Sequence, residues 1–183
     1  MNRRLAQGYS GEHPARDPAE TVAVVALGAN LGDRAATIEA ALHDLARLPL
    51  TTAVTAAEPI ETVAVTLAGP DADAPAYLNT VALLTTRLAP TVLLSYLHAI
   101  EARHGRPART PAEPRWLDRT LDLDLIAYGD VRSDGAALTL PHPRAAERDF
   151  VLTPWLTVDP DAVLPGVGAV AELRDRLRTE GSA

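Results

Sequence analysis

An α+β fold is predicted by three observations along this 183-residue chain. Residues 21–27 form an apolar run rich in valine, which is typical of a buried strand. Residues 121–125 alternate leucine with aspartate, which is typical of a half-buried strand. Two helix-like and two further strand-like segments lie between them, in the order strand, helix, strand, strand, helix, strand. This is the order of a ferredoxin-like βαββαβ sandwich, to which we expect extra C-terminal elements to be added.

The first predicted strand ends at Gly28, and a helix is expected to follow it. Asp33 suits the N-cap of this helix, because its side chain can accept a hydrogen bond from a free backbone N–H. The apolar residues after it recur at helical spacing, at Ile38, Leu42 and Leu45. Residues 50–57 and 79–88 predict the second and third strands. The segment around residues 67–75 is rich in Gly, Pro and Asp, and it is long enough to be a functional loop.

The second helix is predicted at residues 91–104. Pro90 suits the start of a helix, and Gly105 supplies its C-terminal stop. Its apolar stripe consists of Leu93, Leu97 and Ile100. The helical period fails between residues 106 and 119, where three prolines occur, so this segment is predicted to be a second long loop. The fourth strand follows it directly.

One domain is predicted at residues 21–178, between a disordered tail at 1–20 and a loose tail at 179–183. Its last part contains a proline-rich segment at 140–154 and a short helix at 169–178. No composition break divides the domain. We expect a cytoplasmic protein, since no apolar run is long enough to span a membrane. A monomer is also expected.

Composition excludes several kinds of chemistry. The chain contains no cysteine, which excludes disulfides, thiolate zinc sites and cysteine nucleophiles. All 17 basic residues are arginine, so there is no lysine for a Walker loop or a Schiff base. The net charge of −7 argues against a general nucleic-acid-binding surface. Any phosphate must therefore be bound by arginine, backbone amides or a metal ion.

Asp122 and Asp124 are candidate magnesium ligands. The alternation of their strand places both on one face, with backbones about 6.6 Å apart. Mg²⁺ commonly takes one or two protein carboxylates and leaves its other positions to water and substrate phosphate. The exposed polar face of an edge strand is an equally simple explanation for the pair taken alone.

Arginines and a few aromatic residues surround this strand in the sequence. Five arginines occupy a short stretch of an otherwise acidic chain, at Arg103, Arg106, Arg109, Arg115 and Arg119. Their planar guanidinium groups suit phosphate, although solvated pairing with nearby acids also explains them. Tyr77, Trp116 and Phe150 lie near predicted loop edges, and together with the Asn79 amide they suit a flat heterocycle. Packing in the core is the alternative for Tyr77 and Phe150, and a turn is the alternative for His142.

Four motifs stand out along the chain: ALGANLGDR from Ala26, YLNTVALL from Tyr77, RTLDLDLIAYG from Arg119 and LPHPRAAERDFVLTPW from Leu140. Together they resemble a known family, the 6-hydroxymethyl-7,8-dihydropterin pyrophosphokinases. The order and spacing of these motifs span roughly residues 23–160. The resemblance implies transfer of pyrophosphate from ATP to the pterin hydroxymethyl group in folate biosynthesis, with release of AMP.

The resemblance also implies roles for individual residues. Two Mg²⁺ ions would be held by Asp122 and Asp124, and these aspartates with Arg106 and Arg119 would be catalytic. The residues implied around ATP are Glu101, Arg106, Arg109, Arg119, Thr139, His142 and Arg148. Those implied around the pterin are Thr62, Tyr77, Asn79, Trp116 and Phe150. ATP and the pterin are the expected partners, without nucleic acid or membrane.

Three stretches depart from the family pattern, and two other functions remain open. The segment between Gly105 and Trp116 is longer than the family pattern implies. The usual Trp-Gly-Pro-Arg is Trp116-Leu117-Asp118-Arg119 here, and the Thr-Pro pterin loop is replaced by Glu61-Thr62-Val63-Ala64. A magnesium-dependent phosphohydrolase that uses the same aspartates is the first alternative function. A binding module without turnover is the second.

Overall fold

The computed structural model describes residues 20–66, 69–71, 74–105 and 120–180. Its centre is an antiparallel sheet in the order β2-β6-β1-β7, and β3 pairs with another part of β6. The strands of this sheet are β1 (Thr21–Ala29), β2 (Thr51–Ala56), β3 (Ile60–Thr62), β6 (Tyr77–Thr86) and β7 (Asp122–Tyr128). The observed order of strands and helices confirms the predicted βαββαβ arrangement.

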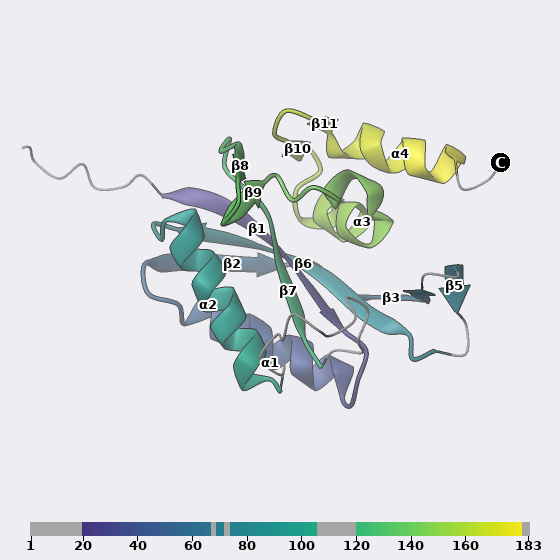
Figure 1. Cartoon of the computed structure of the whole chain (residues 1–183), viewed down its shortest axis with the longest axis horizontal. Coiled ribbons are helices and arrows are strands. Elements are labelled where there is room, and N and C mark those ends of the chain that lie inside the picture. Colours follow the sequence, from purple (N-terminus) through teal and green to yellow (C-terminus); the bar gives the residue numbers. More distant parts are fainter. Residues whose placement is uncertain (1–19, 67–68, 72–73, 106–119, 181–183) are drawn as a thin grey trace, which may run out of the picture.

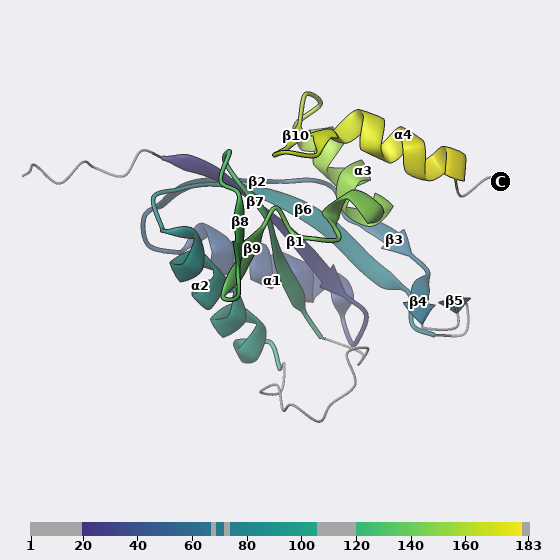
Figure 2. The same cartoon turned by 45° about the horizontal axis from the view of Figure 1, so that its top comes forward.

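Helices cover both faces of the sheet (Figures 1 and 2). The first face carries α1 (Arg34–Ala46) and α2 (Pro90–Arg103), and the second carries α3 (Asp149–Val158) and α4 (Val170–Glu180). Alternate residues of β1 divide between the two cores. Ala23, Val25 and Leu27 pack with the first pair of helices, whereas Val24 and Ala26 pack with the second pair.

Short elements complete the described part of the chain. Three two-stranded hairpins pair β4 with β5, β8 with β9, and β10 with β11. Their bounds are β4 (Ala64–Thr66), β5 (Gly69–Asp71), β8 (Ser133–Gly135), β9 (Leu138–Leu140), β10 (Val163–Leu164) and β11 (Gly168–Ala169), and a 3-10 turn, η1, spans Ala145–Glu147. In the part of the chain that the structure describes, no helix is both long and apolar enough to cross a bilayer.

Helix α3 was missing from the sequence prediction, which treated 140–154 as a proline-rich segment. Pro154 lies inside this helix, where proline removes a backbone donor and normally disfavours helical structure. Burial of Val151, Leu152 and Trp155 in the second core offsets that preference. Local sequence rules underestimate such a helix because its stability comes from tertiary contacts.

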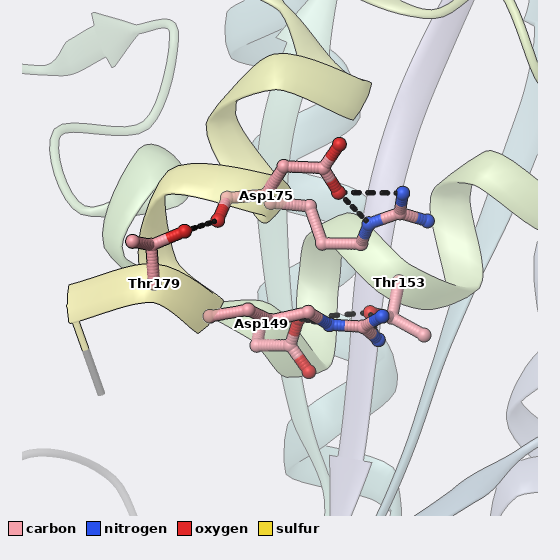
Figure 3. Close-up of polar contacts among 6 residues, drawn as sticks. Asp149, Thr153, Asp175 and Thr179 are labelled. Atoms are coloured by element: carbon pink, nitrogen blue, oxygen red, sulfur yellow. Dashed lines mark hydrogen bonds and ion pairs between the residues drawn. The ribbon is translucent and has the colours of Figure 1, made fainter. Parts of the chain in front are cut away.

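The C-terminal helix α4 continues to Glu180, two residues beyond the predicted helix at 169–178. Figure 3 shows Thr179 beside Asp175, and its hydroxyl donates to the Asp175 carbonyl at 3.0 Å. The same helix contacts α3, since Arg178 donates to Thr153 Oγ1 at 3.4 Å. Residues 1–19 and 181–183 lie outside the described residues, and the single-domain boundaries stay a prediction.

Candidate active site

Two strands place polar residues in one row across the sheet, on either side of a glycine of β1. On β1, Gly28 is opposite Asn79 of β6 on one side and Asp122 of β7 on the other. Asp124 lies one row further along, opposite Ala26. Residues directly opposite one another on neighbouring strands project to the same face. Asn79, Asp122 and Asp124 therefore share the face that α3 covers.

Gly28 is a site residue that the sequence analysis treated only as the end of a strand. A β-carbon at this position would lie 2.9 Å from Asn79 Oδ1 and 4.0 Å from Tyr77 Cδ1. The missing side chain thus leaves the space in which the Asn79 amide lies over β1. This role depends on which residues face each other across two strands, and no local pattern reveals it.

Asp124 is paired with an arginine at the start of α3. Arg148 Nη1 donates to Asp124 Oδ2 at 2.7 Å, and both side chains are partly buried. His142 Nε2 lies 3.8 Å from the same oxygen. The backbone N–H of His142 also donates to the Ile126 carbonyl of β7 at 2.8 Å, which fixes this segment against the strand. The structure therefore brings together Asp124, His142 and Arg148, three of the predicted site residues.

His142 is held in one orientation and favours its neutral form. Its Nδ1 accepts the Arg144 N–H at 3.2 Å, so the neutral ring carries its proton on Nε2, toward Asp124. Burial lowers the pKa of His142 below its ordinary 6.5. Asp124 opposes that shift in pKa, while the charge of Arg148 adds to it. At neutral pH, His142 is consequently a hydrogen-bond donor rather than a proton acceptor.

The residues predicted to bind a flat heterocycle come from β3, β6 and α3. Thr62 and Tyr77 are opposite each other in the β3–β6 pair, and Asn79 Nδ2 donates to Thr62 Oγ1 at 2.7 Å. Phe150 is half-buried at the start of α3, with the Arg148 guanidinium 5.7 Å from the centre of its ring. One amide and two aromatic rings thus lie on β6 and α3, and β1 separates β6 from the strand that carries the acidic pair.

Glu101 and Thr139 differ sharply in their surroundings. The Glu101 side chain is buried, with the residue 1% exposed, and its Oε1 accepts the Leu123 N–H of β7 at 2.9 Å. Thr139 is exposed on the β8–β9 hairpin. Glu101 therefore supports the edge of the strand that carries Asp122 and Asp124. No nucleotide contact is needed to explain its carboxylate.

Four predicted site residues lie outside the described residues. They are Arg106, Arg109, Trp116 and Arg119, all within 106–119. Their roles stay predictions from the sequence. The described chain resumes at Thr120, immediately before β7.

The acidic pair fits magnesium in number and kind. Across the described ranges, no group of three or more His, Asp or Glu side chains is arranged to enclose a metal. Two partly exposed carboxylates on one rigid strand are what Mg²⁺ needs when water and phosphate complete its octahedron. The oxygen donors disfavour zinc, which prefers Cys and His in a closed site.

Solved structures with the same fold include two longer chains. One is the HPPK-DHPS in complex with substrates, with a TM-score of 0.64 and 10% identity over 89% of this chain. The other is the Plasmodium falciparum HPPK-DHPS with pteroate, with a TM-score of 0.65 and 11% identity over 91% of this chain. This chain spans 44% of each. At such low identity, these likenesses show the fold alone.

Similarity of sequence identifies the family. The chain is 41% identical over 157 residues to the 2-amino-4-hydroxy-6-hydroxymethyldihydropteridine pyrophosphokinase of Pseudomonas aeruginosa, covering 86% of this chain and 92% of that protein. It is 36% identical over 151 residues to the Haemophilus influenzae enzyme of the same name, covering 82% and 89%. Residues 24–160 match the family model described as 7,8-dihydro-6-hydroxymethylpterin-pyrophosphokinase. The chain therefore belongs to the 7,8-dihydro-6-hydroxymethylpterin-pyrophosphokinase (HPPK) family.

Proposed function

We propose that this chain transfers pyrophosphate from ATP to the hydroxymethyl group of 6-hydroxymethyl-7,8-dihydropterin, releasing AMP in folate biosynthesis. The observation that carries the proposal is the shared sheet face on which Asn79 and Asp122 flank Gly28, with Asp124 one row away. A heterocycle site and a phosphate site are thereby adjacent. A monomer in the cytoplasm remains the prediction from sequence.

The phosphate half of the site is proposed around β7 and the start of α3. Asp122 and Asp124 would hold Mg²⁺, in two ions, and magnesium would neutralise charge on the triphosphate. Arg148 and the Nε2–H of His142 lie beside Asp124 and can donate to phosphate oxygens. The other residues proposed near ATP are Glu101, Arg106, Arg109, Arg119 and Thr139, with Arg106 and Arg119 in the transfer step.

The pterin half is proposed around β3, β6 and Phe150. Tyr77 and Phe150 offer aromatic faces, and the Asn79 amide can pair with the edge of the heterocycle. Asn79 is 6% exposed and already donates to Thr62, which orients its amide. Trp116 completes the proposed set from the sequence.

In the proposed reaction, the enzyme acts mainly by aligning ATP with the hydroxymethyl group of the pterin. The hydroxymethyl oxygen bonds to the β-phosphorus, the bond from that phosphorus to the oxygen bridging the α-phosphate breaks, and AMP leaves with that oxygen. The hydroxyl proton passes to a carboxylate of the acidic pair. His142 is unsuited to accept it, because its Nδ1 is already hydrogen-bonded and its Nε2 carries a proton. Orientation and preorganised charge then supply most of the acceleration.

We expect AMP formation to depend on the pterin. AMP should be measured with ATP and Mg²⁺, with and without 6-hydroxymethyl-7,8-dihydropterin. A pyrophosphokinase should form AMP only when the acceptor is present. Loss of ATP without the pterin would favour the phosphohydrolase, and no product in either assay would favour a binding module.

Replacing Gly28 with alanine should weaken the binding of the pterin selectively. The new β-carbon would displace the Asn79 amide, so we expect the KM for the pterin to rise about tenfold, with little change in the KM for ATP. Steady-state kinetics with each substrate varied in turn would measure both. Gly135→Ala is the matched control, because its β-carbon would meet nothing closer than 3.5 Å. Equal effects of the two variants would contradict the prediction.

A further inference from the structure

Arg34 connects two segments at the pterin end of the sheet. It is the first residue of α1, and its side chain is 31% exposed. Nη1 donates to the Ala76 carbonyl at 2.6 Å, and Nη2 donates to Glu61 Oε2 at 3.1 Å. These partners lie 42 and 27 residues away along the chain. One guanidinium group therefore bridges β3 to the segment that enters β6.

Both partners are immediate neighbours of residues proposed to bind the pterin. Ala76 precedes Tyr77, and Glu61 precedes Thr62. Thr62 and Tyr77 form the last pair of the β3–β6 ladder, beyond which the chain continues into the β4–β5 hairpin. Figures 1 and 2 show that hairpin beyond the end of the central sheet. The Arg34 bridge thus connects the two strands at the end of the ladder nearest the β4–β5 hairpin.

The β3–β6 ladder has few other constraints at this point. Strand β3 is three residues long and pairs with β6 alone among the described strands. Its position controls Thr62, whose hydroxyl accepts from Asn79. A shift of β3 relative to β6 would therefore move the amide that is proposed to orient the pterin. The charged donors of Arg34 oppose such a shift, because they satisfy a backbone carbonyl and a carboxylate at once.

Helix stability gives no reason for an arginine at this position. A positive charge in the first helical turn is opposed by the helix dipole, which favours acidic residues there. The helix begins without its help, since Asp33 Oδ1 accepts the Ala36 N–H at 3.0 Å. Arg34 is better explained by the two contacts that its guanidinium makes outside the helix.

We propose that Arg34 is a positioning residue for the pterin side of the site, acting through Glu61 and the Ala76 carbonyl. This inference rests on the proposed function and on the assignment of Thr62, Tyr77 and Asn79 to the pterin. Arg34 holds the β3–β6 pair in the register and spacing that those side chains need. It touches neither substrate in this role, so its loss affects one substrate through displaced neighbours.

The test compares Arg34→Ala with the matched control Arg174→Ala. Arg174 is similarly exposed, at 27%, and its ion pair with Asp175 at 2.8 Å stays within α4, where Figure 3 shows Asp175. We expect Arg34→Ala to raise the KM for the pterin about tenfold and to leave the KM for ATP within about twofold. Arg34→Lys should restore part of the loss, because an ammonium group can reach one of the two acceptors. Arg174→Ala should behave as wild type.

Further variants keep the proposal open to contradiction. Glu61→Gln keeps an acceptor and loses the charge, so it should raise the pterin KM less than Arg34→Ala does. If Arg34→Ala does not fold, Glu61→Gln tests the proposal in its place. Equal rises in the KM for both substrates, or an unchanged pterin KM with a lowered Tm, would overturn the positioning role. Asn79→Ala separates the two proposals, because a wild-type pterin KM in that variant would overturn the site assignment itself.

Discussion

Asp122→Asn and Asp124→Asn should each lower kcat by about three orders of magnitude, with only a modest change in Tm. Asparagine keeps the shape of aspartate but removes the negative charge that would hold Mg²⁺, the ion that would neutralise charge on the triphosphate. Asp124→Asn also leaves the Arg148 guanidinium without its anionic partner at 2.7 Å. AMP formation at saturating ATP and pterin, over a range of Mg²⁺ concentrations, would measure the loss.

A matched control separates the metal site from the loss of an ion pair. Asp175 is paired with Arg174 at 2.8 Å on α4, close to the 2.7 Å of the Asp124–Arg148 pair. Asp175→Asn should therefore retain wild-type turnover. Near-wild-type turnover in either variant would show that the replaced carboxylate is not needed to hold the metal.

The alternation of residues 121–125 was sufficient to place Asp122 and Asp124 on one face, because the side-chain period of a strand is fixed by its geometry. The order of the main elements followed from equally local patterns. The row that joins Asn79, Gly28 and Asp122 could not be predicted from local patterns, since it depends on the register between three strands. Sequence spacing alone carries no information about that register beyond the face that each residue occupies.

The role of Arg34 was hidden for a related reason. Its partners are Glu61 and the backbone of Ala76, and a backbone carbonyl leaves no signature in the sequence. The motif from Ala26 includes Arg34, but a motif does not say what a side chain contacts. Tertiary contacts of this kind become visible only when the chain is folded.

Glu101→Ala should be the most destabilising single change in the described site, at about 2–4 kcal/mol. Strand β7 is the last strand of the sheet among the described residues, so no described strand lies beside it to accept the outward N–H of Leu123. Glu101 Oε1 accepts this hydrogen bond instead, at 2.9 Å from the Leu123 nitrogen. Glu101 is buried, at 1% exposed. Alanine would leave the buried donor unsatisfied and a cavity beside it. Urea denaturation of the variant and the wild type would measure the difference in the free energy of unfolding.

Glu39→Ala is the control for this prediction, since Glu39 is exposed on α1 and its loss should change stability by less than about 0.5 kcal/mol. Glu101→Gln keeps one acceptor oxygen for Leu123 and should lose less stability than Glu101→Ala. The two possible roles of Glu101, supporting β7 and contacting ATP, predict different results for Glu101→Gln. A raised KM for ATP at wild-type stability in Glu101→Gln would favour direct nucleotide contact. A lowered free energy of unfolding with an unchanged KM would assign Glu101 to holding the strand on which Asp122 and Asp124 lie.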